Sequence, residues 1–537
     1  MNRYTTGLAT ALLFAVQPIL AAAQEPDTKA QSKAFAQRID NIINKRLQAE
    51  NLKPGPRAEP GQLGRRLHID LIGRIPALLE ARDFLDPTNN APTKLEDLVD
   101  SLLDNDAYSY NFAHYWRSVM LAGTRQQNVQ TQFEGWLRNR LASNTRYDKL
   151  AYELLTSGRG DAKGGDTKGG GQQPGTPAGF YTANENKAEN LAGATARVFL
   201  GVKIECAQCH KHPFAKWTRE QFWEYAAFFA GVQQQFRGGP PQKGVDPNGR
   251  SIKIPDTDKV VQAKFINGDN PDWTGNKQPR NVLAEWMTSP KNPYFAKAAV
   301  DHVWQYFFGV SLMEPIFEPT DDSPPAHPEL LDELANSFTE SGYDLKFLIR
   351  AIIQTEAYQR GSIALNADNK EQIQLFARMP VRGMMPEQLF DCFAEATDLS
   401  PAQRGNNGMD NFNQGFGVPN TPRGIFLAKF QSQDKRIETQ TSILQALYLM
   451  NGTFLADRVR LDKNKALETI ATAPTSTARR VRDLFLMVMS RLPRQDETDR
   501  LVRYIEAAGD PNSAAQRQAV ADVYWALLNS SEFMLNH

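Results

Sequence analysis

The sequence predicts a mainly α-helical protein with two helical domains joined by an irregular Gly/Pro-rich connector and little β structure. Apolar residues recur three and four positions apart over most of the 537 residues, which is the period of an amphipathic helix. No alternation of strands with helices appears, so a parallel-sheet fold is not expected. Residues 233–279 are rich in Gly, Pro, Asn and Asp, and they form the predicted connector.

The first 23 residues have the pattern of a secretory signal peptide. Arg3 gives a positive start, residues 7–16 form a short apolar run, and residues 21–23 offer a small-residue cleavage site. An uncleaved N-terminal anchor is the alternative. No later segment approaches the roughly 20 uninterrupted apolar residues that a membrane helix needs. We therefore expect a periplasmic or secreted mature chain without a membrane span.

The predicted N-terminal domain covers residues 28–232. Its first helix is expected over residues 27–50, and further helices over 95–103, 110–121 and 133–141. Nine glycines in residues 158–179 predict a flexible loop, because such a stretch buries too little apolar area to offset its ordering entropy. A helix over 187–202 is expected to lead into a cysteine pair. Thr218-Arg219-Glu220-Gln221 then fits a capping box that begins the next helix.

The predicted C-terminal domain covers residues 280–537. Helices are expected over residues 281–287, 295–307, 328–338, 345–354, 386–396, 443–450, 478–489 and 514–528. In the connector, the alternating runs 251–254 and 260–265 predict a small hairpin. Lys plus Arg and Asp plus Glu both total 61, so no net field attracts nucleic acid, and none is expected as a partner.

The strongest chemical signal is the pentad Cys206-Ala207-Gln208-Cys209-His210. In a c-type haem two thiols add to the vinyl groups, and the following histidine becomes an axial ligand of the iron. With 3 Cys and 7 His in the chain, about 0.0002 such pentads are expected by composition alone. Export favours this chemistry, because haem is attached covalently outside the cytoplasmic membrane. The pattern therefore predicts haem c bound at Cys206, Cys209 and His210.

Other uses of the same residues stay open. Cys206 and Cys209 could form a redox-active or structural disulfide. A non-haem metal ion could be held by both thiolates with His210 or His212. His212 could instead bind a haem propionate or orient its loop. A distal haem ligand would come from elsewhere, unless the iron is five-coordinate, and the candidates are His114, His302, His327, Met120 and Met287.

Longer motifs accompany the pentad in the N-terminal half, and a different set lies in the C-terminal half. In the N-terminal half they are Arg65-Arg66-Leu67-His68-Ile69-Asp70-Leu71-Ile72-Gly73, His114-Tyr115-Trp116, Val198-Phe199-Leu200-Gly201-Val202 and the pentad extended through Lys211-His212-Pro213-Phe214 to Trp217. In the C-terminal half they are Trp286-Met287-Thr288-Ser289-Pro290, Asn292-Pro293-Tyr294-Phe295-Ala296, Val303-Trp304, His327-Pro328-Glu329-Leu330-Leu331 and Met450-Asn451-Gly452. On these residues the chain resembles the planctomycete cytochrome-like domain family, paired with its companion C-terminal domain of unknown function.

The resemblance covers nearly the whole mature chain. It implies an exported protein that accompanies a sulfatase-like or alkaline-phosphatase-like protein in extracytoplasmic polymer breakdown. One departure is Asp301-His302, where the resemblance implies Asn-Arg, so His302 becomes a further candidate metal ligand. The predicted function is electron transfer to a protein redox partner through haem c. The alternative is a helical scaffold, stapled by a non-haem metal ion or a disulfide, that binds a partner such as the sulfatase-like protein.

Overall fold

The structure is a computed structural model that describes residues 28–88, 93–124, 126–158, 175–209, 217–232, 249–313, 327–363, 369–399, 421–430 and 453–537. The predicted signal peptide, most of the predicted loop 158–179 and the predicted helix 443–450 lie outside these residues. Within them the chain is mainly helical, with two small two-stranded sheets. The predicted fold class is confirmed.

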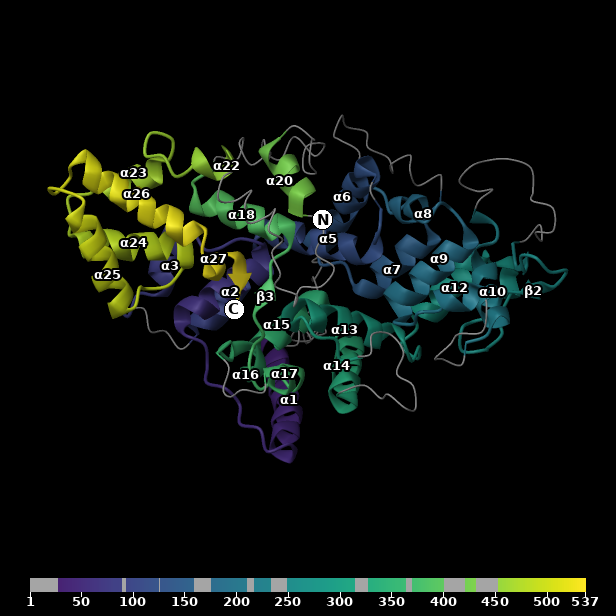
Figure 1. Ribbon diagram of the computed structural model, residues 1–537. Coiled ribbons are helices and arrows are strands. Elements are labelled where there is room, and N and C mark those ends of the chain that lie inside the picture. The colour runs from purple at the N-terminus through teal and green to yellow at the C-terminus, as the bar shows by residue number, and fades with distance from the viewer. Residues whose placement is uncertain are drawn as a thin grey trace, which may run out of the picture.

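Helices follow one another through the N-terminal part of the chain (Figure 1). They are α1 (Thr28–Ala49), α2 (Pro60–Ile72), α3 (Leu78–Phe84), α4 (Lys94–Asp104), α5 (Asp106–Met120), α6 (Gln127–Ala142), α7 (Tyr147–Thr156), α8 (Gly179–Ala183), α9 (Ala188–Thr195) and α10 (Arg219–Ala226). Shorter turns are the π-helical η1 (Ala196–Leu200) and the 3-10 turns η2 (Glu205–Gln208), η3 (Ala227–Phe229) and η4 (Thr274–Asn276).

Helices also dominate the C-terminal part. They are α12 (Pro279–Met287), α13 (Phe295–Phe308), α14 (Pro328–Glu340), α15 (Leu345–Gln354), α16 (Glu356–Gln359), α17 (Asn369–Gln374), α18 (Pro386–Ala396), α20 (Pro422–Phe430), α22 (Thr453–Ala456), α23 (Lys465–Thr472), α24 (Thr477–Met489), α25 (Gln495–Ala507), α26 (Ala514–Leu528) and α27 (Ser531–Met534). Figure 1 shows α23 to α26 at one end of the molecule and α9, α10 and β2 at the other.

The two sheets differ in how far apart their strands lie in the sequence. β1 (Ser251–Lys253) and β2 (Val260–Gln262) form an antiparallel hairpin in the predicted connector, as their alternating pattern predicts. β3 (Arg382–Gly383) pairs instead with β4 (Leu535–Asn536), close to the end of the chain. This second pairing brings the C-terminal residues beside α2 in the middle of the molecule (Figure 1).

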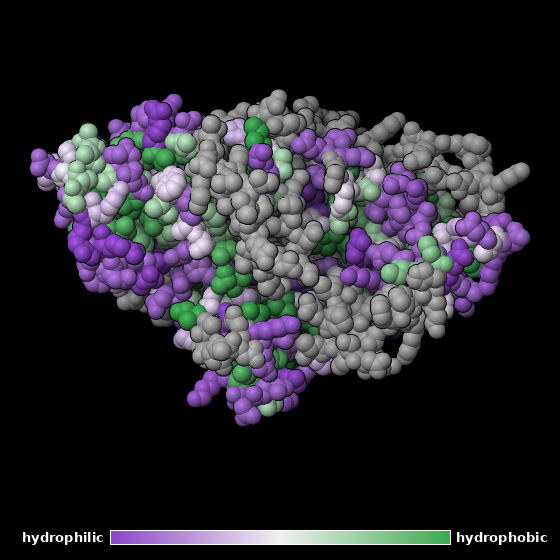
Figure 2. All heavy atoms as spheres, viewed as in Figure 1, coloured by the Kyte–Doolittle hydropathy of each residue, from purple (hydrophilic) through white to green (hydrophobic). Residues whose placement is uncertain are grey.

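Two clusters of buried apolar side chains form the core. The larger cluster runs from Phe35 to Met379 and includes residues of both predicted domains. The smaller joins Ile69 and Ile75 to side chains between Met384 and Phe533. The predicted domain boundaries stay a prediction. In Figure 2 the helices at both ends of the molecule expose mainly hydrophilic side chains, as amphipathic helices do around an apolar core.

A fully buried ion pair lies where α2 meets the C-terminal part of the chain. The Asp70 carboxylate accepts hydrogen bonds from the Arg382 guanidinium at 2.8 and 3.2 Å, and both side chains are inaccessible to solvent. The Tyr358 hydroxyl donates to the same carboxylate at 2.9 Å, and so does the Asn536 amide at 2.9 Å. Asp70 therefore binds three segments that are distant in sequence.

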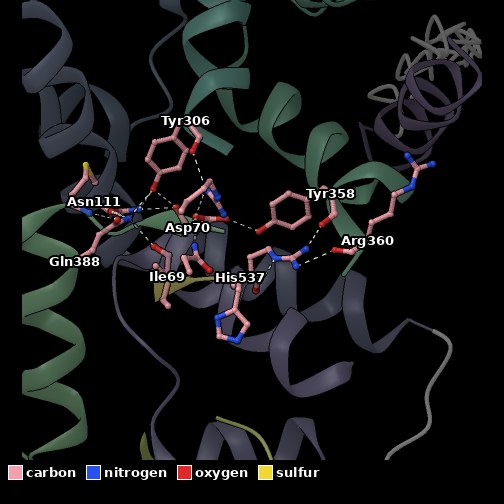
Figure 3. Close-up of polar contacts among 12 residues, drawn as sticks. Ile69, Asp70, Asn111, Tyr306, Tyr358, Arg360, Gln388 and His537 are labelled. Carbon is pink, nitrogen blue, oxygen red and sulfur yellow. Dashed lines mark hydrogen bonds and ion pairs between the residues drawn. The ribbon is translucent and has the colours of Figure 1, made fainter. Parts of the chain in front are cut away.

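The main chain of α2 extends this network (Figure 3). The Asp70 carbonyl oxygen accepts from the Tyr306 hydroxyl at 2.6 Å and the Asn111 amide at 2.8 Å. Gln388 donates to the Ile69 carbonyl at 3.1 Å. Because buried polar groups without partners are costly, these contacts fix how α5, α13 and α18 pack around α2.

Arg66 adds a second set of contacts one turn earlier in α2. Its guanidinium donates to the main-chain oxygens of Tyr358, Arg360 and His537, the last two at 3.1 and 3.3 Å. Burial lowers the pKa of Arg66 to about 10, which leaves the group charged near neutral pH. The guanidinium of Arg66 thus donates to three main-chain carbonyls at once.

Candidate functional site

The cysteine pair follows an irregular stretch of helix. The sequence predicts one helix over residues 187–202, but the α-helix ends at Thr195 and continues as the π-helical turn η1. Gly201 then reverses the chain with φ +65°, a conformation that suits glycine. The π-helical turn holds the Val198 carbonyl, which accepts from Nε2 of His302 on α13 at 3.0 Å. π-Helical turns are rare and often lie beside functional sites.

Both thiols of the pair face solvent. Cys206 lies inside the 3-10 turn η2 and Cys209 directly follows it. A 3-10 helix has three residues per turn, so side chains three positions apart are eclipsed and share one face. Cys206 and Cys209 are both exposed and are not joined by a disulfide, whereas Ala207 between them is fully buried. Both thiols are therefore exposed to solvent, while the Ala207 side chain between them packs into the protein.

The end of η2 is held by α10. The Gln208 carbonyl oxygen accepts from Nε1 of Trp223 at 3.1 Å and from Nε of Arg219 at 3.3 Å. The predicted capping box at the start of this helix is confirmed, since Thr218 Oγ1 accepts from the Gln221 main chain at 3.2 Å and Gln221 Oε1 accepts from the Thr218 main chain at 2.9 Å. The cap sets where α10 begins, and this start places Arg219 and Trp223 within hydrogen-bonding distance of the cysteine turn.

The start of η2 is held by α9 and η1. Glu205 forms an ion pair with Arg197 at 2.9 Å. Its side chain lies over Gly193, where an added Cβ would come within 2.7 Å of Glu205 Cγ. A larger residue at this position would therefore push Glu205 away. Both ends of the cysteine turn are thus fixed by side chains from neighbouring helices.

The aromatic residues after the pentad belong to the core. Phe222, Trp223, Tyr225, Phe228 and Phe229 are each at most 3% exposed. They pack against one another and against connector residues, as where Phe228 stacks on Phe265 with 5.3 Å between ring centroids. They fill the space behind the cysteine turn, so their density in the sequence reflects core packing.

The predicted histidine ligands divide into two groups. His210 and His212 lie outside the residues that the structure describes. His302 is buried, and because the Val198 carbonyl can accept but not donate, Nε2 of His302 carries the hydrogen. Burial lowers its pKa to about 4. Its assignment as a metal ligand stays a prediction, and Nε2 would have to leave Val198 to fulfil it.

The candidate distal haem ligands also lie within packed regions. His114 Nδ1 is 3.1 Å from the Glu134 carboxylate, and both side chains are buried between α5 and α6. His327 donates through Nε2 to the Gln374 carbonyl at 2.9 Å. Met120 and Met287 are at most 1% exposed within the larger apolar cluster. Cys392 is likewise fully buried, and burial raises the pKa of its thiol to about 12.

Metal coordination at the turn would need ligands beyond the two thiols. Across the ten described ranges, no group of three His, Cys, Asp or Glu side chains comes together in a way that could hold a metal ion. A third ligand to Cys206 and Cys209 would therefore come from residues such as His210 or His212, which follow directly in the sequence.

Comparison with known families places the turn inside a recognised segment. Residues 38–234, which include Cys206 and Cys209, match the model of a family described as a protein of unknown function (DUF1549). Residues 279–430 match a second, also described as a protein of unknown function (DUF1553). Two families of unknown function thus match the chain in order. Their order agrees with the predicted pairing of two domains.

No curated protein and no solved structure matches the chain. Among the helices that the structure describes, none has the length and apolar character to cross a membrane. The chemistry of the cysteine turn therefore has to be argued from its own geometry.

Proposed function

We propose that this is a periplasmic or secreted electron-transfer protein with a c-type haem attached at Cys206, Cys209 and His210. The observation that carries the proposal is the exposure of both thiols, Cys206 within the 3-10 turn η2 and Cys209 directly after it, with His210 next in the sequence. Thioether formation needs two accessible thiols on the same side of the chain and a histidine immediately after them. The turn meets the first requirement, and the sequence meets the second.

Each part of the turn has a defined task in this proposal. A bound haem would supply one-electron redox chemistry. Cys206 and Cys209 would hold the group, and His210 would be the axial ligand. Ala207 within the turn and Trp223 on α10 are both buried, and they would close the protein side of the turn to water. The redox partner is proposed to be a protein in the same compartment, and the family resemblance suggests a sulfatase-like or alkaline-phosphatase-like one.

The expected result is covalent haem in protein made in a strain with cytochrome c maturation. The reduced pyridine spectrum should show the band of a haem with two thioether bonds. Cys206→Ala or Cys209→Ala should shift the band to longer wavelength or abolish it, because one vinyl group then stays unsaturated. The matched control Cys392→Ala removes a thiol that is buried far from solvent, and it should keep the full haem content. Wild-type protein without haem would overturn the proposal.

A second candidate use of the site is favoured by the same thiol geometry. Two thiolates three residues apart can hold a metal ion such as zinc, or close into a disulfide that joins Cys206 to Cys209 across the end of η2. Metal analysis and thiol counting on the haem-free sample distinguish these outcomes. One metal ion per chain would support the metal-stapled scaffold, and the loss of two titratable thiols without metal would support the disulfide.

A further inference from the structure

We propose that Trp223 and Arg219 are positioning residues that set the spacing of the Cys206 and Cys209 thiols. The inference deepens the proposed function and rests on it only in the use of both thiols together. Its basis is the Gln208 carbonyl, which belongs to the peptide group between Gln208 and Cys209. Two donors from α10 bind this one oxygen, at 3.1 and 3.3 Å.

The geometry explains why these two donors act on Cys209 in particular. A peptide group is planar, so fixing its carbonyl oxygen also fixes the direction of the Cys209 N–H and of the bond to its Cα. The other end of the turn is held separately, through the Glu205 ion pair with Arg197. The Cys206 end and the Cys209 end are therefore set by different helices, and α10 determines where the second thiol stands relative to the first.

Arg219 also connects the turn to the hairpin of the connector. Its Nη2 donates to the Pro255 carbonyl, in the loop between β1 and β2, at 2.7 Å. The same guanidinium thus bridges η2 and the hairpin across the start of α10. Trp223 is 3% exposed and packs edge-on against Phe222, with 5.4 Å between ring centroids. A buried indole and a guanidinium held at two points are rigid donors, which suits a positioning role.

The test measures thiol spacing directly, on the full chain made without haem attachment. Phenylarsine oxide bridges two neighbouring thiols: two As–S bonds form, and both thiol protons leave with the oxide oxygen as water. N-Ethylmaleimide reacts with each thiol alone and is insensitive to the spacing. The ratio of arsenical affinity to maleimide rate therefore reports how the two thiols are placed relative to each other. It does so whether or not the protein carries haem in the cell, so failure of the haem proposal leaves this test intact.

We expect Trp223→Phe to lower the arsenical affinity about tenfold while the maleimide rates of both thiols stay within about twofold, because one hydrogen bond to a fixed peptide is lost and aromatic packing is kept. Arg219→Gln should act in the same direction, and Arg219→Lys should restore part of the loss. The control Glu220→Gln changes another residue of α10 and removes its exposed ion pair with Lys259, which lies directly before β2; it should leave the ratio unchanged.

Two results would overturn the inference. One is an unchanged ratio in both Trp223→Phe and Arg219→Gln, even if thermal stability falls, because the residues would then support the fold alone. The other is an equal change of the ratio in Glu220→Gln, which would assign the effect to the helix as a whole. If Trp223→Phe does not fold, Arg219→Gln with its Lys rescue decides alone.

Discussion

Replacing Asp70 by asparagine is expected to lower the free energy of unfolding by about 3–5 kcal/mol. The substitution keeps the shape of the side chain but removes its charge. Arg382 would then stay buried and fully charged without a carboxylate, although it donates to Asp70 at 2.8 and 3.2 Å in the native protein. Breaking one member of a buried pair is costly because the remaining charge cannot return to water.

Denaturant unfolding of the two proteins measures this effect. The matched control is Asp462→Asn, which makes the same chemical change in an exposed pair with Arg460 at 2.8 Å. Exposed pairs contribute little to stability because solvent screens them, so this control should change the free energy of unfolding far less than Asp70→Asn does. A loss at Asp70 no larger than the loss at Asp462 would contradict the structural role of the network around α2.

Replacing His302 by glutamine is expected to reduce the loss of unfolding free energy between neutral pH and about pH 4 by about 3 kcal/mol. Burial lowers the pKa of His302 to about 4, against 6.5 in the unfolded chain. Above about pH 6.5 the His302 imidazole is neutral in both the folded and the unfolded chain. As the pH falls toward about 4 the unfolded chain binds a proton that the folded protein resists, so stability is lost over this window. Glutamine does not titrate, and its amide can still donate to the Val198 carbonyl.

The measurement compares unfolding free energies at about pH 7 and about pH 4.5 for both proteins. Wild type should lose more stability on acidification than His302→Gln does. Tyr115→Phe serves as the control, because it removes the Tyr115 hydroxyl bond to the His302 carbonyl at 2.5 Å without removing a group that titrates in this range. Equal pH slopes in wild type and His302→Gln would show that His302 is not held neutral in the native protein.

Local patterns were sufficient to predict much of the helical structure. The helices over 345–354, 386–396 and 514–528 have the predicted bounds, because each combines an apolar stripe with clear end signals. At the first of these, Asp344 accepts from the Phe347 main chain at 3.1 Å, as an N-cap does. The hairpin in the connector and the capping box at Thr218 were also predictable, since both depend on residues close in sequence.

Contacts between distant residues could not be predicted in the same way. Asp70 and Arg382 are separated by more than half of the chain, and no local pattern pairs them. The π-helical turn before the cysteines was missed because its residues, 196–200, keep an ordinary helical pattern. The sequence singled out Cys206 and Cys209, yet the donors to the Gln208 carbonyl depend on how α10 packs.

The most direct test of the haem proposal is the mass of the intact, denatured protein after expression with cytochrome c maturation. Covalent haem survives denaturation, so we predict the mature chain plus the mass of one haem, and the unmodified mass when Cys206 and Cys209 are both replaced by alanine. A wild-type mass equal to the chain with two reduced thiols, or lower by two hydrogens as in a disulfide, would contradict the proposal.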